Sequence, residues 1–231
     1  NQPEVKLVTE EGRSFVRRSR ETYDAIISVH TISNAAVASG ALSLSENYVL
    51  TREAFIEYLD HLTPDGVIYF TRPEPQIARL FATAREALAV FSKFNAAWHL
   101  YAFREKPDEW ETRSFGVNRP AFLAGFMLKK APFKREEISK IEALLGIGQP
   151  RKPADVVYET LYSPLHLDQD SIYNTLVTAP DLQAVYRAQP AQIEPATDDR
   201  PFFNHHTRWS SINWQTFKEL ITHKKLGMLM L

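Results

Sequence analysis

The stretch that most constrains the fold runs over residues 23–72. It holds two short apolar runs, residues 25–29 and 67–70, whose length and β-branched content are typical of buried strands. Between them, Phe55, Leu59 and Leu62 recur at the four- and three-residue spacing that places side chains on one face of a helix. Strand, helix and strand in this order predict a βαβ crossover, and therefore a parallel sheet.

Local signals mark the ends of this helix and the loop before it. Thr51 is a suitable N-cap, and Glu53 adds a negative charge to the first turn. Residues 63–66, Thr-Pro-Asp-Gly, predict a turn before the second strand. The loop over residues 30–47 is longer than most strand-to-helix connections, and it leaves the carboxyl end of its strand, where open α/β sheets bind ligands. We expect a functional site on this loop.

Apolar patterns on either side extend this unit. They predict strands over residues 5–8, 98–103 and 121–128. Helical spacing predicts a short helix from Phe15 and longer helices over residues 76–91 and 138–145, with Gly146 as the C-terminal cap of the last one.

The composition changes after Gly146. Prolines divide residues 147–231, no strand pattern continues, and short helices are predicted over residues 171–177 and 181–188. We expect this extension to pack on the domain formed by residues 1–146, because several aromatic side chains would be costly to expose. These are Tyr158, Tyr162, Tyr173 and Tyr186.

Composition limits the function classes. A net charge of −1 gives no electrostatic basis for binding nucleic acid. The absence of cysteine excludes disulfides and thiolate catalysis. No apolar run is long enough to span a bilayer.

The two ends of the chain indicate an excerpt of a longer protein. The first residue is Asn1 rather than methionine, and the last six, residues 226–231, form an apolar tail after Lys224 and Lys225. The tail is either a last amphipathic helix or the start of a membrane segment that continues after Leu231, with the lysines on the cytoplasmic side. We expect a cytoplasmic location, as a free protein or as the cytosolic domain of an inner-membrane protein.

Four strings resemble motifs of a known family. Residues 23–27 (Tyr-Asp-Ala-Ile-Ile) and 62–67 (Leu-Thr-Pro-Asp-Gly-Val) are similar to two strands of spermidine synthases, which have the class I S-adenosylmethionine-dependent transferase fold. Residues 44–48 (Leu-Ser-Glu-Asn-Tyr) and 195–203 (Pro-Ala-Thr-Asp-Asp-Arg-Pro-Phe-Phe) resemble motifs of spermidine-synthase-like domains fused to membrane segments in bacteria. The resemblance covers residues 5–209.

The resemblance implies an α/β fold with a partial Rossmann-like, mostly parallel sheet. The final strand of that sheet is antiparallel, and an irregular helical extension follows. It implies alkyl or methyl transfer from S-adenosylmethionine or decarboxylated S-adenosylmethionine to a small-molecule substrate. The strand at residues 5–8 corresponds to the third strand of the family's sheet, so the glycine-rich loop and the ribose-binding acid that precede it are absent from this sequence. The implied partner is the missing N-terminal half of the same domain, and we do not expect this chain alone to bind the cofactor well.

Cofactor and substrate contacts can be assigned from the same alignment of motifs. Glu11, followed by Gly12, matches the acid that bonds the adenine amino group in the family; otherwise it is a solvated turn residue. His30 is a candidate general base, because imidazole titrates near neutral pH, or else a polar residue bonded to backbone at a strand end.

The substrate loop departs from the family pattern. Residues 28–33 contain no carboxylate, whereas spermidine synthases bind a diamine with acids at this place. A desolvated cationic amine needs anionic partners, so aminopropyl transfer to putrescine is disfavoured. Ser28, Thr31 and Asn47 remain as candidate substrate-loop residues. Glu46 is a candidate catalytic carboxylate, although Glu46 and Asn47 could equally tie the loop down through backbone hydrogen bonds.

Three clusters of ionisable residues remain, and the first two allow two interpretations each. Arg13, Arg17 and Arg20 share one predicted helix face, as a solvated surface or as an anion site. The cluster at residues 198–200, Asp-Asp-Arg, is a structural clasp in which Arg200 pairs with a carboxylate while Phe202 and Phe203 anchor the extension, or else a catalytic group. His205 and His206 are adjacent and therefore point to opposite sides in extended chain, so we predict no metal site.

Two functions of different classes follow. The first is an S-adenosylmethionine-dependent transferase domain. The second is a ligand- or partner-binding cytosolic domain of a membrane protein that has lost catalysis, consistent with the missing carboxylates.

Overall fold

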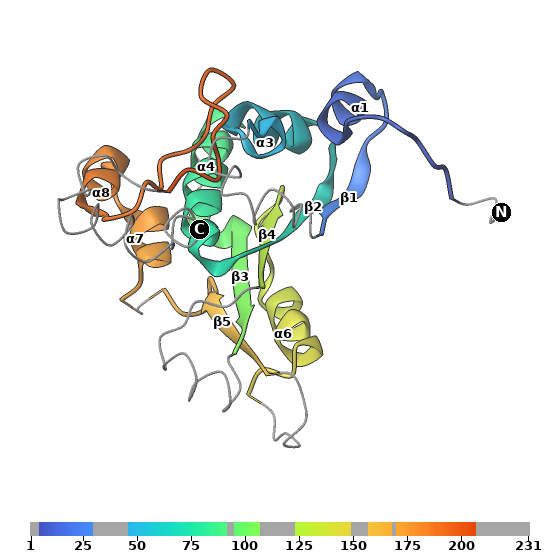
Figure 1. Ribbon diagram of the computed structural model, residues 1–231. Coiled ribbons are helices and arrows are strands. Elements are labelled where there is room, and N and C mark those ends of the chain that lie inside the picture. Colours follow the sequence, from blue (N-terminus) through green and yellow to red (C-terminus); the bar gives the residue numbers. More distant parts are fainter. Residues whose placement is uncertain are drawn as a thin grey trace, which may run out of the picture.

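The described residues form one mixed sheet with helices on both faces. The computed structural model describes residues 5–29, 46–91, 95–106, 123–148, 157–167 and 170–206. Its five strands are β1 (Tyr23–Ser28), β2 (Leu62–Arg72), β3 (Leu100–Glu105), β4 (Ala124–Lys129) and β5 (Tyr158–Tyr162). Their order in the sheet is β1-β2-β4-β3-β5, as Figure 1 shows.

Strand directions confirm the expected fold class. β1 and β2 pair in parallel, and β4 lies antiparallel between β2 and β3, so β1, β2 and β3 run in the same direction. β5 is antiparallel to β3 and ends the sheet. This is an α/β arrangement of partial Rossmann-like type with an antiparallel final strand. Among the described strands, parallel neighbours are confined to β1 and β2.

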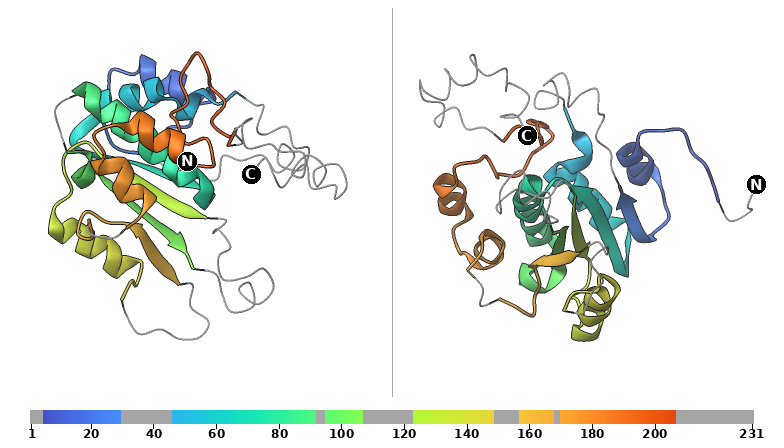
Figure 2. Two further views of the ribbon diagram at one scale, coloured as in Figure 1. Left: turned by 90° about the vertical axis from the view of Figure 1, so that its left-hand side faces the viewer. Right: turned by 60° about the horizontal axis from the view of Figure 1, so that its bottom comes forward.

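Helices cover the two faces of the sheet unequally (Figure 2). The main core lies between the sheet and α3 (Arg52–Asp60), α4 (Ile77–Phe91) and α7 (Ile172–Thr178). Its centre is a cluster of aromatic rings from α3, α4 and the sheet: Phe55, Phe70, Phe81 and Phe126. On the opposite face, α6 (Arg135–Leu144) packs Ile138 against Tyr101 and Phe103 of β3. The alternation of side chains along each strand supplies both cores.

Capping residues fix the helix ends, and Thr51 and Gly146 do so as the sequence predicts. The Thr51 hydroxyl accepts a hydrogen bond from the backbone N–H of Ala54 at the start of α3. Ser171 and Asp181 cap α7 and α8 (Leu182–Ala188) in the same way. Gly146 follows α6 with a φ of 65°, a conformation that favours glycine. Single-turn helices precede α3, α4 and β3: η2 (Tyr48–Leu50), η3 (Glu74–Gln76) and η4 (Ala96–His99).

The prediction of a strand over residues 5–8 is wrong. These residues are outside any strand and pair with no other described segment. Val5, Leu7 and Val8 are 58%, 91% and 46% exposed. An apolar run becomes a strand only when a partner supplies its backbone hydrogen bonds, and no described strand does so here.

The predicted turn at residues 63–66 is also wrong, because this segment lies within β2. The pairing of Tyr23 with Leu62 and of Ala25 with Val67 brackets a bulge in β2, so the ladder continues on both sides of it. The chain approaches β1 closely at this point. A Cβ atom on Gly66 would lie 2.9 Å from the Tyr23 carbonyl oxygen, so glycine is required there by space.

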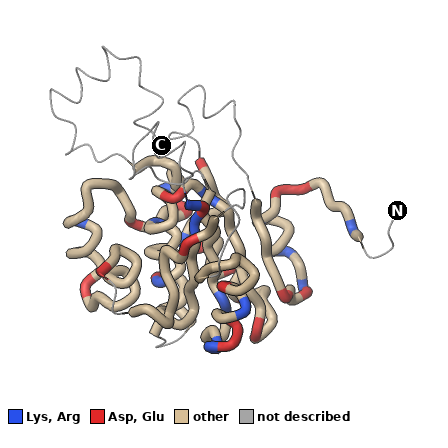
Figure 3. Tube along the Cα trace, turned by 90° about the horizontal axis from the view of Figure 1, so that it is seen from below, with Lys and Arg blue, Asp and Glu red and all other residues tan. Residues whose placement is uncertain are grey.

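The expectation that no strand follows Gly146 is wrong as well, since β5 pairs with the outer edge of β3. The later segments pack closely on the earlier ones: Tyr162, Tyr173 and Tyr186 are buried, and Tyr162 and Tyr173 contact the ring of Phe81. Within the described residues no helix has the length and apolar character needed to cross a membrane. The apolar tail at residues 226–231 lies outside them. Charges of both signs lie close together along the chain (Figure 3).

Candidate functional site

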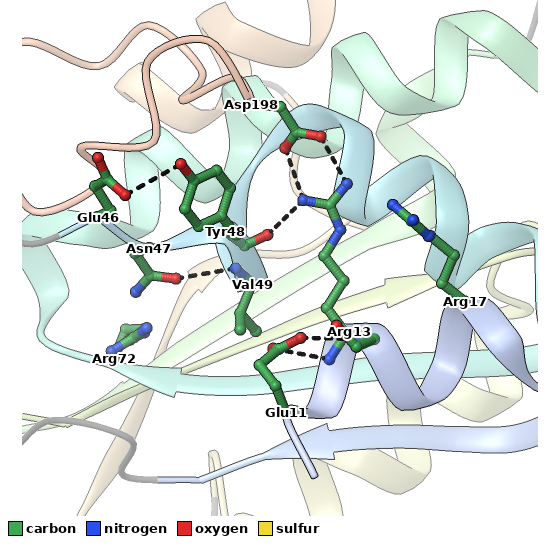
Figure 4. A pocket seen from close by; sticks show the side chains of 10 residues that line it. Glu11, Arg13, Arg17, Glu46, Asn47, Tyr48, Val49, Arg72 and Asp198 are labelled. Carbon is green, nitrogen blue, oxygen red and sulfur yellow. Dashed lines mark hydrogen bonds and ion pairs between the residues drawn. The ribbon is translucent and has the colours of Figure 1, made fainter.

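A polar cavity of about 700 Å³ opens beside the carboxyl end of β2 (Figure 4). Four parts of the chain line it: the start of α1 (Gly12–Arg18), the segment from Glu46 through η2, the end of β2, and the C-terminal segment. Its lining residues are Glu11, Arg13, Ser14, Arg17, Glu46, Asn47, Tyr48, Val49, Arg72 and Asp198. We call this cavity the pocket.

One wall of the pocket is held by the Arg13 clasp, which consists of Arg13, Glu57 and Asp198. The Arg13 guanidinium donates to both oxygens of Glu57, at 2.8 and 3.0 Å, and to both oxygens of Asp198, at 2.7 and 2.8 Å. It also donates to the Tyr48 carbonyl oxygen at 3.0 Å. All five N–H groups of a guanidinium can thus be satisfied. The clasp joins α1, α3, η2 and the C-terminal segment.

The charges of the clasp reinforce one another. The hydrogen bond from Arg13 holds the pKa of the Asp198 carboxyl below its ordinary value. The hydrogen bond to Asp198, followed by that to Glu57, raises the pKa of Arg13. The Thr51 hydroxyl adds a 2.7 Å hydrogen bond to Asp198, so three donors hold this carboxylate in place.

Glu11 caps the N-terminus of α1 and also lines the pocket. Its carboxylate accepts hydrogen bonds from the backbone N–H groups of Arg13, at 2.9 Å, and Ser14, at 2.7 Å. Burial raises the pKa of this carboxyl, but those hydrogen bonds outweigh it and the net shift is downward. Glu11 is therefore an oriented, ionised acceptor on the pocket wall. Gly12 is exposed at the first position of α1, and a Cβ there would meet nothing within 4 Å.

Arg72 is the last residue of β2 and lines the pocket without an ion pair to any described residue. It is only 4% exposed. Within the described chain its guanidinium contacts no carboxylate; its recorded contact is with the ring of Phe203, whose centroid is 5.9 Å from Cζ. Burial lowers the pKa of Arg72 to about 10, so the side chain stays charged at neutral pH.

The segment before α3 completes the pocket. The Asn47 side-chain oxygen accepts from the Val49 N–H at 3.2 Å, and the Asn47 N–H donates to the Pro201 carbonyl oxygen at 2.6 Å. The Tyr48 hydroxyl donates to the exposed Glu46 carboxylate at 3.1 Å. Asn47 thus lines the pocket and also bonds to backbone, as both expected alternatives require, whereas Glu46 lines the pocket and bonds to the side chain of Tyr48.

A second buried arginine holds the C-terminal segment against α4. Arg79 donates to the carbonyl oxygens of Glu194, Phe202, Phe203 and His205 at 2.6–3.0 Å. It also lies over the Phe203 ring, 5.5 Å from its centroid. This cluster places residues 194–205 so that Asp198 reaches Arg13.

The structure distributes the predicted site residues as follows. Glu11, Glu46 and Asn47 come together in the pocket, whereas Ser28 ends β1 and is not among its lining residues. His30 and Thr31 lie outside the described residues. Arg13 is buried and ion-paired, so its interpretation as solvated surface is wrong, because Glu57 and Asp198 offset the cost of its burial.

The clasp predicted around residues 198–200 forms with a different arginine. Asp198 pairs with Arg13, while Arg200 is exposed. Phe203 is fully buried and anchors the segment as expected, but Phe202 is 38% exposed. In sequence, the position of Arg72 at the carboxyl end of a strand was the available signal for its place in the pocket, and it was missed.

Metal-binding geometry does not occur in the described part of the chain, where no three potential ligand residues come together. His206 is buried, and burial lowers its pKa to about 4, so it is neutral at pH 7.

Comparison with known proteins gives no family assignment. No family model matches the chain, and no curated protein matches it. Among solved structures, a probable spermidine synthase from Corynebacterium glutamicum ATCC 13032 aligns with a TM-score of 0.45 and 16% sequence identity, over 69% of this chain and 50% of that one. The chain thus spans half the length of that protein. At this identity the likeness concerns the fold alone.

Proposed function

We propose that this chain is part of a spermidine-synthase-like transferase domain whose pocket binds S-adenosylmethionine or its decarboxylated form. The observation that carries the proposal is the placement of the pocket. It opens at the carboxyl end of β2, where open α/β sheets bind ligands, and it is lined by the oriented carboxylate of Glu11.

The hydrogen-bonding groups of the pocket fit such a cofactor. A carboxylate that accepts two backbone hydrogen bonds retains lone pairs for a further donor, so Glu11 can hold an adenine amino group or a ribose hydroxyl. The cofactor would supply an electrophilic carbon next to its sulfonium. The chain's own part is to align a nucleophile with that carbon and to accept the proton that the nucleophile loses. His30 and the exposed Glu46 are the candidate bases.

The nucleophile we propose is a small molecule other than a diamine. Asp198 is bonded to Arg13 and Thr51, and Glu11 is the acceptor proposed above for the cofactor. The sequence between Ser28 and Glu46 contains neither Asp nor Glu. A cationic amine has few anionic partners in such a site, which favours transfer to a neutral or anionic acceptor.

The rest of the same domain is the partner we propose for the edge of the sheet. β1 is an edge strand in the described sheet, and Ile27 on it is 63% exposed. An exposed strand edge with apolar side chains is a pairing surface. A strand from a preceding segment, which would also supply the remaining cofactor contacts, would cover it.

A second candidate is a cytosolic ligand- or partner-binding domain of a membrane protein without catalysis. The observation that favours it is that two of the three carboxylates that line the pocket, Asp198 and Glu11, also serve the fold. A site that has given its acids to structural bonds can bind a ligand without activating it.

Calorimetric titration of the complete protein separates the two. We expect saturable binding of S-adenosylmethionine or of the decarboxylated form. Glu11→Gln should weaken that binding by about tenfold, because it removes a charged acceptor. Glu10→Gln is the matched control, since Glu10 pairs with Arg18 and does not line the pocket. No heat with either compound overturns the transferase proposal, and binding without turnover on any acceptor supports the second candidate.

A further inference from the structure

We infer that Arg72 is the anion-binding residue of the pocket, and that the ligand carries a carboxylate or phosphate group bound to its guanidinium. The inference deepens the proposed function and rests on it only in taking the pocket as the ligand site. Nothing in the family resemblance assigns this residue.

The buried charge of Arg72 is costly. Arg72 is 4% exposed, and no carboxylate of the described chain offsets its charge. The other buried arginines are satisfied: Arg13 by two carboxylates, Arg79 by four carbonyl oxygens. A buried charge without a partner is destabilising, and groups kept at such a cost gather at binding sites.

The contact with Phe203 leaves the N–H groups of the Arg72 guanidinium free to bind a ligand. The Phe203 ring attracts the guanidinium charge with its centroid 5.9 Å from Cζ, but it accepts no conventional hydrogen bond. The N–H donors lie in the guanidinium plane, where they fit two oxygens of one carboxylate or phosphate. Since Arg72 lines the pocket, these donors are available to a ligand within it.

A second donor lies close by. Asn47 lines the same pocket, and its side-chain oxygen is used by the Val49 N–H. Within the described chain its amide nitrogen makes no hydrogen bond, and in Figure 4 that nitrogen lies on the side of Arg72. A cation and a neutral amide donor that line one pocket can together bind the oxygens of an anionic group.

An anion site at Arg72 would distinguish S-adenosylmethionine from its decarboxylated form. S-adenosylmethionine has a carboxylate and the decarboxylated form does not, so a carboxylate bound by Arg72 selects the first. An anionic acceptor substrate is the other source of the same group. The two sources have one chemistry, and the experiment distinguishes them.

The test measures binding of inorganic phosphate to the complete protein at constant ionic strength, by the side-chain Nε–Hε resonances of arginine, and binding of both cofactor forms by calorimetry. Four variants are compared. Arg72→Gln removes the charge and Arg72→Lys keeps it. Asn47→Asp keeps the acceptor for Val49 but sets a negative charge beside Arg72. Arg18→Gln removes an exposed charge outside the pocket.

The expected result is saturable phosphate binding that shifts the Arg72 resonance. Arg72→Gln and Asn47→Asp should weaken it by about tenfold or more, whereas Arg72→Lys weakens it less and Arg18→Gln leaves it within about twofold. Asn47→Asp keeps the test valid if Arg72→Gln does not fold. A preference for S-adenosylmethionine over the decarboxylated form that Arg72→Gln abolishes assigns the anion to the cofactor. Equal affinity for the two forms, with phosphate binding that depends on Arg72, assigns it to the acceptor.

The outcomes separate the two proposals. If neither cofactor form binds while phosphate binds through Arg72, the transferase proposal fails and the anion site holds. The anion site is overturned if the wild-type protein does not bind phosphate, or if Arg72→Gln and Asn47→Asp bind it as the wild type does, provided that both variants also leave the affinities for the two cofactor forms unchanged. This holds whether or not the cofactor binds.

Discussion

Arg13 and Arg72 lie in one pocket and are buried to nearly the same degree, at 6% and 4% exposure, but their surroundings are opposite. Arg13 is enclosed by two carboxylates, and its pKa is raised by the hydrogen bonds to Asp198 and Glu57. Arg72 faces the pocket without a described carboxylate, and burial lowers its pKa to about 10. Burial alone therefore does not tell what a charged residue does. The partners that offset its charge distinguish a structural arginine from one available to a ligand.

The largest expected effect is on the clasp. Arg13→Met should reduce the free energy of unfolding by about 3 kcal/mol, because it leaves Glu57 and Asp198 close together without their cation. Denaturant unfolding measures this change. Arg18→Met, on the exposed face of the same helix, should stay within about 0.5 kcal/mol. Equal losses for the two variants would contradict a structural role for Arg13.

The next effect concerns the arginine that uses carbonyl oxygens instead of carboxylates. Arg79→Met should cost about 2 kcal/mol, since it leaves buried carbonyl groups of residues 194–205 without a donor. The same variant should increase hydrogen exchange in residues 194–205 more than in β2. Uniform exchange across both segments would show that Arg79 supports the whole fold rather than this segment.

The clasp also makes stability depend on pH. The folded-state pKa of Asp198 lies below its ordinary 3.8, so its stabilisation is present above that value and is lost as pH falls through the folded-state pKa. Asp198→Asn lacks this titration, and its free energy of unfolding should fall less steeply than that of the wild type below about pH 4. Unfolding curves at several pH values measure the difference. Parallel pH profiles would mean that Asp198 is not ion-paired in solution.

The smallest expected effect is at Arg72. Arg72→Met gives up the contact with Phe203 but also removes a buried charge, so the free energy of unfolding should change by less than about 1 kcal/mol. Denaturant unfolding without ligand is the measurement. A loss as large as that of Arg13→Met would remove the contrast between the two arginines and assign Arg72 to the fold.

Local sequence patterns predicted the parts of the fold that local forces control. The faces of α3 and α4, the cap Thr51, and the apolar strands β1 and β2 were all visible in short windows. The strand at residues 5–8, the turn at residues 63–66 and the absence of β5 were wrong for one reason. Strand formation depends on a partner elsewhere in the chain, which a short window does not contain.

The pocket shows the same limit more sharply. Glu11, Glu46 and Asn47 were found because they stand in recognisable motifs near turns. The state of Arg13 is set by Glu57 and Asp198, which are 44 and 185 residues away. That of Arg72 is set by the lack of a described carboxylate partner, which no local pattern records. Charge compensation is a property of the folded arrangement, and the sequence shows only the candidates.

The 185-residue separation of Arg13 and Asp198 has a consequence for how the pocket assembles. During synthesis the wall of the pocket stays open until the last part of the described chain has emerged and docked on α4. Closing so long a loop costs chain entropy, which the contacts of Arg13 and Arg79 with this segment offset. A ligand that binds only the closed pocket would therefore hold the C-terminal segment in place, and protease resistance of residues 194–205 would report occupancy of the site.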